Sequence, residues 1–321
     1  MLVNIVIINY RTPKLLIDCL TSLQQDMKSE QTKITVVDNC SGDNSVAEIE
    51  RAIEKNQWNK SVTLIESSVN GGFSAGNNLG IKAQKADAYL LLNSDTIVRS
   101  GAITSLVKAM EANPKAGLVS PRLEWPNGEP QISCFRYHSP LSELIDAAGS
   151  GPITKLFQKF DVPVSVSNKP INPQWTSFAC ILIRHEVVEQ IGLMDEGYFM
   201  YFDDVDYCRR ATNAGWQILH CPQAKVVHLR GGSNSVKADM AARKRPKSYL
   251  YASRTRYFTK FYGSMGLWFA NLFWLTGRCI SLLRELIKNK EPHLCEYQAI
   301  DIWRNWRNPM KPFLLKERKT S

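Results

Sequence analysis

The chain has 321 residues, 44% of them hydrophobic and 22% charged, and its 40 Lys and Arg residues against 30 Asp and Glu residues give a formal net charge of +10. This composition excludes a disordered, collagen-like or disulfide-scaffold protein, and the length fits one large α/β domain or two smaller ones. The positive charge favours an anionic partner, such as a nucleotide, a nucleic acid or an acidic lipid surface.

The cysteines and the N-terminus indicate the compartment. Eight cysteines are scattered without a C-x-x-C pair, which argues against a zinc ribbon or disulfide framework and favours a reducing environment. The first ten residues, MLVNIVIINY, carry no basic flank before their apolar run. We therefore expect a buried first strand there, no signal peptide, and a cytoplasmic protein.

Short apolar runs alternate with helical patterns over the first 120 residues. The predicted strands are Val3–Asn9, 34–38, Val62–Glu66, 88–92 and 117–119. The predicted helices follow Thr12-Pro13 and occupy 41–55, 74–85 and 102–110. This rhythm predicts an open, mostly parallel sheet with helices on both faces and with ligands at the carboxyl ends of its strands.

The pattern changes after residue 120. Frequent prolines predict a loop-rich stretch from 121 to 175. The later predicted elements are a strand at 175–183, helices at His185–Ile191 and 205–214, and an extended segment at 218–228. We therefore divide the chain into two halves of one domain, 1–120 and 121–235, and a C-terminal segment, 236–321.

The C-terminal segment combines basic and aromatic residues. Residues 237–256 are strongly basic, and residues 265–276 are rich in Trp, Phe and Leu. This apolar run is shorter than the ~20 residues that a membrane-spanning helix needs. A basic stretch beside such a run is typical of a helix that lies in a membrane interface, and we favour this interpretation over nucleic-acid binding. A helix packed on the rest of the domain is the alternative.

Polar residues stand where the predicted strands end. Asn9 and Tyr10 end the first strand and Asp38 the second, where a carboxylate can accept hydrogen bonds from a nucleoside. Capping of the next helix is an equal alternative for Asp38. Asn93-Ser94-Asp95 ends the fourth strand, where Asp95 could bind a divalent cation or simply form a turn.

Two further segments are candidates for chemistry. The glycine-rich loop at 70–80 lets backbone approach a ligand, although most such loops are only turns. Asp203, Asp204 and Asp206 begin a helix after an aromatic run, so at least one of them should have a raised pKa and could act as a general base. Complementing the helix dipole is the alternative. His228 matters only if it meets Asp95 at one metal ion.

Five segments, taken together and in their order along the chain, resemble glycosyltransferase family 2. The chain looks most like the rhamnosyltransferase-type bacterial branch of that family. The segments are IINY at 7–10, VVDN at 36–39 with Ser41 and Asp43, NGGFSAGNN at 70–78, LLNSDT at 91–96 and YFMYFDDVDYCRR at 198–210. The resemblance implies an α/β protein of GT-A type, with a Rossmann-like, mostly parallel central sheet flanked by helices, followed by a C-terminal helical extension. Residues 1–120 would be the nucleotide-sugar-binding half, 121–235 the acceptor-binding and catalytic half, and 236–321 a membrane-associating segment.

The resemblance also implies roles for single residues. Those that would contact the donor are Asn9, Tyr10, Asp38, Gly72, Phe73, Asn77, Asn93, Ser94 and Asp95. Asn93 stands where the family's D-x-D metal motif has its first acid, so Asp95 is the dependable ligand of that motif. Asp95 and His228 would together hold Mn²⁺ or Mg²⁺. Asp204 matches the family's base. Asp203 would contact the acceptor, as would Trp175, for which a place in the core is equally plausible.

The activity implied by the resemblance is that of a metal-dependent, inverting hexosyltransferase. The expected donor is dTDP-L-rhamnose, and the expected acceptor is a glycan or a polyprenyl-diphosphate-linked glycan at the inner face of the cytoplasmic membrane, in bacterial cell-surface polysaccharide synthesis. A UDP-sugar donor or an inactive, membrane-binding relative are the alternatives. A nicotinamide-dependent oxidoreductase is disfavoured, because residues 9–13 lack the G-x-G-x-x-G motif that such enzymes carry after the first strand.

Overall fold

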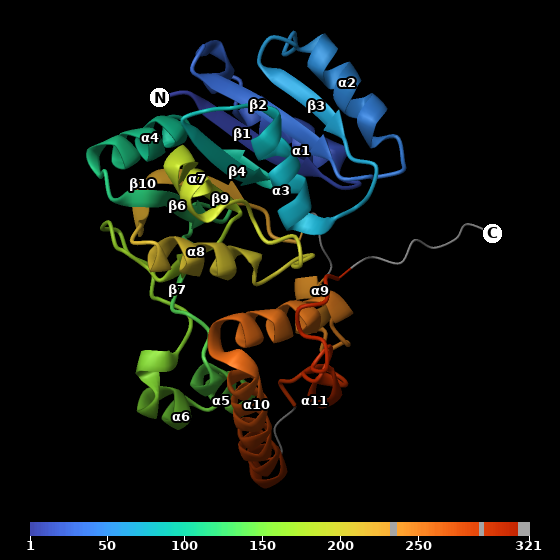
Figure 1. The fold of residues 1–321 in the computed structure, drawn as a ribbon, viewed down its shortest axis with the longest axis vertical. Helices are drawn as coiled ribbons and strands as arrows, with labels where there is room; N and C mark the ends of the chain where they lie inside the picture. Colours follow the sequence, from blue (N-terminus) through green and yellow to red (C-terminus); the bar gives the residue numbers. More distant parts are fainter. Residues whose placement is uncertain (232–235, 289–291, 314–321) are drawn as a thin grey trace, which may run out of the picture.

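The computed structural model describes residues 1–231, 236–288 and 292–313 (Figure 1). An eight-stranded sheet with the order β3-β2-β1-β4-β9-β6-β10-β5 forms its centre. The strands are β1 (Val3–Asn9), β2 (Thr32–Asp38), β3 (Val62–Glu66), β4 (Ala88–Asn93), β5 (Thr96–Val98), β6 (Ala116–Glu124), β9 (Cys180–Arg184) and β10 (Gln217–His228). Strands β3, β2, β1 and β4 are parallel, as are β6 and β10, whereas β9 runs antiparallel between β4 and β6.

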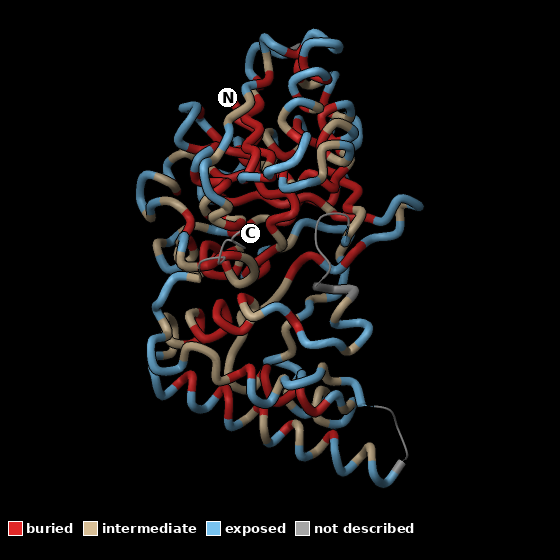
Figure 2. Tube along the Cα trace, turned by 90° about the vertical axis from the view of Figure 1, so that its right-hand side faces the viewer, coloured by how far each residue is buried: buried red, intermediate tan, exposed pale blue. Residues whose placement is uncertain are grey.

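Helices cover both faces of this sheet, as the sequence predicts. One face packs against α1 (Pro13–Ser22), α2 (Ser45–Lys55) and α4 (Ala102–Ala112), and the other against α3 (Gly72–Ala83), α7 (His185–Ile191) and α8 (Asp203–Asn213). Ile5, Val6 and Ile7 of β1 are fully buried because both faces of the strand are covered. Figure 2 shows this burial concentrated in the sheet.

The stretch from 121 to 175 is not the simple loop region that its prolines suggest. It contains α5 (Pro140–Ala148), α6 (Gly151–Leu156), a 3-10 turn η2 (Gln158–Phe160) and the short strand β7 (Cys134–Phe135). Pro140 begins α5 and does not interrupt it, because the first turn of a helix needs no hydrogen bond from that nitrogen. Ser139 caps this helix by accepting from the backbone N–H of Ser142 at 3.2 Å.

Other predicted elements also have different bounds: β6 extends to Glu124, five residues beyond the predicted 117–119, and α3 begins at Gly72, two residues before the predicted 74–85. The predicted strand at 175–183 is two strands, because β8 (Trp175–Thr176) pairs with β7 in a separate sheet and only β9 enters the central one. Helix α2 begins at Ser45, four residues later than expected. Helix α8 begins at Asp203, two residues earlier.

The C-terminal segment is helical, as predicted. It contains α9 (Val236–Ala241), the long α10 (Ser248–Lys288) and α11 (Gln298–Asp301), while residues 289–291 and 314–321 lie outside the described ones. Gly263 has the non-helical backbone angles φ 69° and ψ −179°, and α10 changes direction there (Figure 1). Within the described part of the chain, we find no helix long and apolar enough to cross a membrane.

The two parts of α10 have different neighbours. Tyr257 and Phe258, before the bend, join the core beside α8. Trp274, after the bend, is buried in a smaller cluster with Ala147 of α5. The described helices and strands therefore form a sheet domain to which α5 and α10 add a second, all-helical layer (Figure 1).

Candidate active site

The polar residues predicted at strand ends share one edge of the sheet. The parallel register pairs Asn9 with Asp38 and places Asn93 opposite Ile8, the residue before Asn9. His228 ends β10, which runs in the same direction. The carboxyl ends of parallel strands are where open α/β sheets bind ligands, so this edge is the candidate active site.

Asp38 is held in a buried network of hydrogen bonds. Its Oδ1 accepts from Nδ2 of Asn9 at 2.7 Å and from Oγ of Ser41 at 2.6 Å, and its Oδ2 accepts from the backbone N–H of Ser41 at 2.9 Å. Asn44, and not Asp38, stands at the N-terminus of α2, so the capping alternative is wrong. The carboxylate is oriented and still has lone pairs for a ligand.

Ser41, which belongs to the segments that carry the resemblance, and Arg11 are site residues to which the sequence assigns no role. The backbone N–H of Arg11 donates to Oγ of Ser41 at 2.9 Å, and its Nε donates to the Ser41 carbonyl at 2.8 Å. The Arg11 guanidinium also lies 5.3 Å from the ring centre of Tyr10. A serine three residues after an aspartate is a frequent turn signal, which could have identified Ser41.

The glycine-rich loop is fixed to the loop before α8. Gly72 has φ 83°, and a β-carbon there would overlap the carbonyl oxygen of Phe199. The next N–H, of Phe73, donates to that same oxygen at 2.8 Å. Nδ2 of Asn39 donates to the Gly72 carbonyl at 3.0 Å. Only glycine fits this close approach, and the loop therefore connects the Asp38 side of the site to the acidic helix.

Asn77 has a different environment from the rest of this loop. Its side chain is buried and its Nδ2 donates to the carbonyl of Phe73, one turn earlier in α3, at 3.0 Å. This contact stabilises the first turn of the helix. The structure thus buries Asn77 within α3, as it does Gly72, whereas Phe73 is half-buried.

Asp95 and His228 meet at the end of β4 and β10. Nε2 of His228 lies 3.6 Å from Oδ1 of Asp95, and both side chains are buried. The backbone reinforces the pair, since the N–H of Leu229 donates to the Asp95 carbonyl at 2.9 Å. Oγ of Ser94 lies 3.4 Å from Oγ1 of Thr12, and Asn93 is half-buried at the strand end.

This pair fits a divalent cation in part. Mg²⁺ and similar ions are commonly held by one or two protein ligands while substrate phosphates and water supply the rest. Asp95 and His228 provide one oxygen and one nitrogen donor. Among the described residues no group of three or more His, Cys, Asp or Glu side chains could hold a metal, so phosphate oxygens would have to complete the coordination.

The three carboxylates of α8 have three different environments. Asp206 is fully buried and accepts from Nε of Arg210 at 2.8 Å and from the hydroxyl of Tyr198 at 3.2 Å. Burial, and then repulsion by Asp204, raise the pKa of Asp203 well above its usual range. Asp204 alone of the three is half-exposed. The raised pKa that the sequence predicts for one acid is therefore that of Asp203.

The backbone before these acids is unusual. Tyr201 and Phe202 have φ values of 67° and 63°, a left-handed conformation that costs bulky residues about 1–3 kcal/mol each. Ser253 of α10 stabilises this segment, because its Oγ donates to the carbonyl of Met200 at 3.0 Å. Such conformations are concentrated at functional sites.

Trp175 lies in the core. Its ring stacks on Phe135 with centroids 4.2 Å apart, and its Nε1 donates to the Arg136 carbonyl at 2.7 Å. The side chain is buried. These contacts favour the core alternative for Trp175 over stacking on a sugar.

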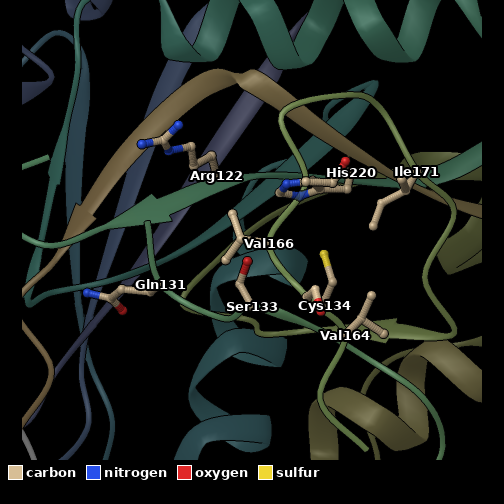
Figure 3. A pocket seen from close by; sticks show the side chains of 10 residues that line it. Arg122, Gln131, Ser133, Cys134, Val164, Val166, Ile171 and His220 are labelled. Atoms are coloured by element: carbon tan, nitrogen blue, oxygen red, sulfur yellow. The ribbon is translucent and has the colours of Figure 1, made fainter. Parts of the chain in front are cut away.

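A small pocket lies apart from these residues, between β6, β10 and the loop around Val166 (Figure 3). Arg122, Gln131, Ser133 and His220 supply its polar lining. Its cavity volume of about 10 Å³ is enough for roughly one water molecule. Burial, and then the charge of Arg122, lower the pKa of His220 to about 4. This pocket is too small for a nucleotide.

Comparison with known proteins supports the resemblance. Residues 4–140 match the model of glycosyl transferase family 2. The chain is 28% identical over 207 residues to the N-acetylglucosaminyl-diphospho-decaprenol L-rhamnosyltransferase of Mycobacterium tuberculosis, covering 63% of this chain and 64% of that protein. It is 25% identical to the dTDP-rhamnosyl transferase RfbF of Shigella flexneri, covering 68% and 66%. The matches thus span just under two thirds of these relatives' lengths.

Solved structures show the same fold at low identity. A mannosyltransferase from Pyrobaculum calidifontis, in complex with GDP-Man and Mn²⁺, matches with a TM-score of 0.57 and 14% identity, covering 96% of this chain and 83% of its own. GalNAc-T7 with UDP, GalNAc and Mn²⁺ matches with a TM-score of 0.60 and 15% identity, covering 96% and 59%. These matches confirm the predicted GT-A type fold. The resemblance that the motifs predict is confirmed as well: residues 4–140 match the glycosyl transferase family 2 model, in a chain similar to rhamnosyltransferases.

Proposed function

We propose that this chain is an inverting glycosyltransferase that moves L-rhamnose from dTDP-L-rhamnose to a hydroxyl of a glycan or lipid-linked glycan in bacterial cell-surface polysaccharide synthesis. The observation that carries the proposal is the meeting of Asp95 and His228 on the sheet edge that also holds the Asp38 network. The names of the similar rhamnosyltransferases support the choice of sugar.

The Asp38 network is the proposed nucleoside site. Asn9 and Ser41 fix the carboxylate of Asp38, so that its remaining lone pairs can accept from a base N–H or a ribose hydroxyl. Tyr10 and the Gly72-Phe73 backbone would border the donor. Arg11 adds a positive charge beside it, which favours a diphosphate.

Asp95 and His228 would hold Mn²⁺ or Mg²⁺, with Asn93 and Ser94 beside them. When bound, such an ion offsets the negative charge that develops on the diphosphate leaving group. The two side chains need no large rearrangement, since their donor atoms already lie 3.6 Å apart.

Asp204 is the proposed base. It accepts the proton of the acceptor hydroxyl while that oxygen forms a bond to the anomeric carbon, from the face opposite the diphosphate. The bond from the anomeric carbon to the diphosphate oxygen breaks in the same step, so the configuration is inverted. Asp203, whose pKa burial and Asp204 raise, would contact the acceptor next to the base.

The proposed acceptor is attached to a polyprenyl diphosphate. The decaprenol-linked acceptor in the name of the mycobacterial relative supports this class. Such an acceptor would place the protein at the inner face of the cytoplasmic membrane.

Calorimetric binding of dTDP, UDP and GDP, each with Mn²⁺ and with EDTA, tests the proposal. We expect dTDP to bind most tightly and only with metal. A preference for UDP would support the transferase activity and indicate a UDP-sugar donor in place of dTDP-L-rhamnose. Failure of the folded protein to bind any of the three would contradict the proposal. Transfer of rhamnose from dTDP-L-rhamnose to polyprenyl-diphosphate-linked N-acetylglucosamine then tests the acceptor.

A further inference from the structure

Helix α10 carries a line of exposed apolar side chains after its bend at Gly263. They fall in two groups at helical spacing, within 265–272 and within 282–287, and both groups lie along one side of the helix. These side chains, here called the apolar stripe, are Met265, Trp268, Phe269, Leu272, Leu282, Leu283, Leu286 and Ile287. Leu286 and Ile287 are each 79% exposed. At 1.5 Å per residue the stripe is roughly 33 Å long.

The other side of the same helix is packed. Ala270, Trp274 and Ser281 are buried, and Gly277 lies so close to α5 that a β-carbon would meet the Leu144 carbonyl oxygen at 2.5 Å. The helix is thus fixed against the protein by one side while the stripe faces outward. Figure 2 shows exposed residues recurring along this helix.

An apolar groove adjoins the first half of the stripe. Its lining is entirely apolar and its cavity volume is about 330 Å³. The lining residues are Met265, Trp268, Phe269, Leu272, Leu275 and Trp303. Trp268 lies 5.0 Å from Trp303 and 6.0 Å from Trp306, measured between ring centroids. Three tryptophans at the edge of an apolar surface are typical of a membrane–water interface.

The charges beside the stripe are positive. Residues 303–313 contain Arg304, Arg307 and Lys311 and no acid, and Arg307 lies 5.1 Å from the ring centre of Trp306. Glu285 is the one acid between 263 and 288, and Arg278 neutralises it at 2.6 Å. Such a surface attracts anionic phosphates and does not repel them.

We propose that the apolar stripe, with Trp306 and Arg307, binds the surface of a bilayer that contains anionic lipids. The helix would lie in the interface, because no helix of the described chain can span a membrane. A line of about 33 Å fits a lipid surface better than a single lipid chain. This inference rests on the proposed function for the role of lipid binding, because a lipid-linked acceptor lies at such a surface. Lipid binding itself can be measured without sugar transfer.

Flotation of the full chain with vesicles tests this inference. Vesicles of phosphatidylcholine alone are compared with vesicles that also contain phosphatidylglycerol. We expect the protein to bind the anionic vesicles and to be released by salt. The double variant Leu286→Glu/Ile287→Glu should lose at least about tenfold in binding, because two side chains can no longer enter the lipid. Leu156→Glu, at another exposed leucine in α6, is the matched control and should bind normally.

A second pair of variants tests the charges. Removing one cation by Arg307→Ala should weaken binding by roughly fivefold, whereas Lys55→Ala on α2 should leave it unchanged. Failure of the unmodified protein to bind anionic vesicles, or equal binding by the Leu286/Ile287 variant, overturns the inference. A dimer in light scattering that this variant converts to a monomer, without a change in vesicle binding, would assign the stripe to a second copy of the chain.

Nucleotide binding separates this inference from the proposed function. The Leu286/Ile287 variant should bind dTDP as the unmodified protein does, which also shows that it is folded. Vesicle binding without nucleotide binding by the unmodified protein would contradict the proposed function alone. Nucleotide binding without vesicle binding would contradict this inference alone.

Discussion

Nζ of Lys260 lies 2.6 Å from Oδ1 of Asp206, so α10 forms an ion pair with α8 two residues beyond Asp204. The same Nζ lies 2.8 Å from Oδ2 of Asp195, to which Arg256 is also paired at 2.7 Å. Through these contacts α10 holds Asp195 and Asp206, which lie on either side of the segment 196–205 that contains Asp204, the proposed base. Arg256 and Lys260 also hold the pKa of Asp195 down, at about 2, against the effect of burial.

Replacing Lys260 by Met should lower the free energy of unfolding by about 1–3 kcal/mol, since Asp206 stays buried with Arg210 as its remaining cation. We also expect a lower kcat with unchanged nucleotide affinity, because Asp204 would be less well positioned. Urea unfolding and steady-state kinetics measure the two effects. Lys260→Arg should restore most of both, and a loss of stability without any change in kcat would show a purely structural role.

Asp204→Asn should reduce transfer by roughly 10²–10⁴-fold, the usual contribution of a general base, and should leave dTDP binding intact. Single-turnover transfer and calorimetry measure these two properties. Turnover by Asp204→Asn at the unmodified rate would remove Asp204 as the base.

The pH dependence of stability should report Asp203. Below about pH 4 this carboxyl is protonated in both the folded and the unfolded chain. Above that pH the unfolded chain loses the proton first, because burial and Asp204 raise the folded pKa, so stability falls as pH rises toward the folded pKa. Asp203→Asn should therefore show a smaller fall in the free energy of unfolding between about pH 4 and 7. Equal slopes for variant and unmodified protein would contradict this assignment.

Asp95→Ala and His228→Ala should each weaken Mn²⁺-dependent dTDP binding, and EDTA should weaken binding to the unmodified protein in the same way. If both side chains hold one ion, the double variant should lose little more than either single one. Calorimetry with and without Mn²⁺ provides all four affinities. Additive losses of dTDP affinity in the double variant, or dTDP affinities that EDTA does not change, would show that the two residues do not share one metal ion.

Gly72→Ala should lower both stability and nucleotide affinity, because the new methyl group would overlap the Phe199 carbonyl oxygen. Gly42→Ala is a matched control with φ 65° and no atom within 4 Å of the new carbon. It should lose only the backbone cost of about 1–2 kcal/mol. Thermal unfolding and dTDP titration compare the two. Equal losses in both variants would show that the contact with Phe199 is unimportant.

The sequence predicts the sheet well where local signals determine the structure. Buried parallel strands such as Val3–Asn9 are continuous apolar runs, and the polar residues that follow them lie on one edge for topological reasons. The antiparallel insertion of β9 between β4 and β6 depends on long-range packing and has no local signal. Helix α5 was missed because Pro140 suggests a break, although it begins the helix.

The site is predictable to a similar degree. Its residue types and order along the chain are visible in the sequence, whereas their environments are not. Which of three neighbouring acids is paired, buried or half-exposed depends on Lys260 and Arg210 from α10 and α8. The burial of Trp175 depends on Phe135, forty residues away.

The bend at Gly263 has a consequence for the choice of acceptor. Residues 248–262 belong to the body that carries Asp204, and residues 264–288 carry the apolar stripe. With the stripe lying on a lipid surface, the bend would set how far the sheet edge stands from that surface. The protein would then select acceptors by the distance between their terminal hydroxyl and the lipid anchor.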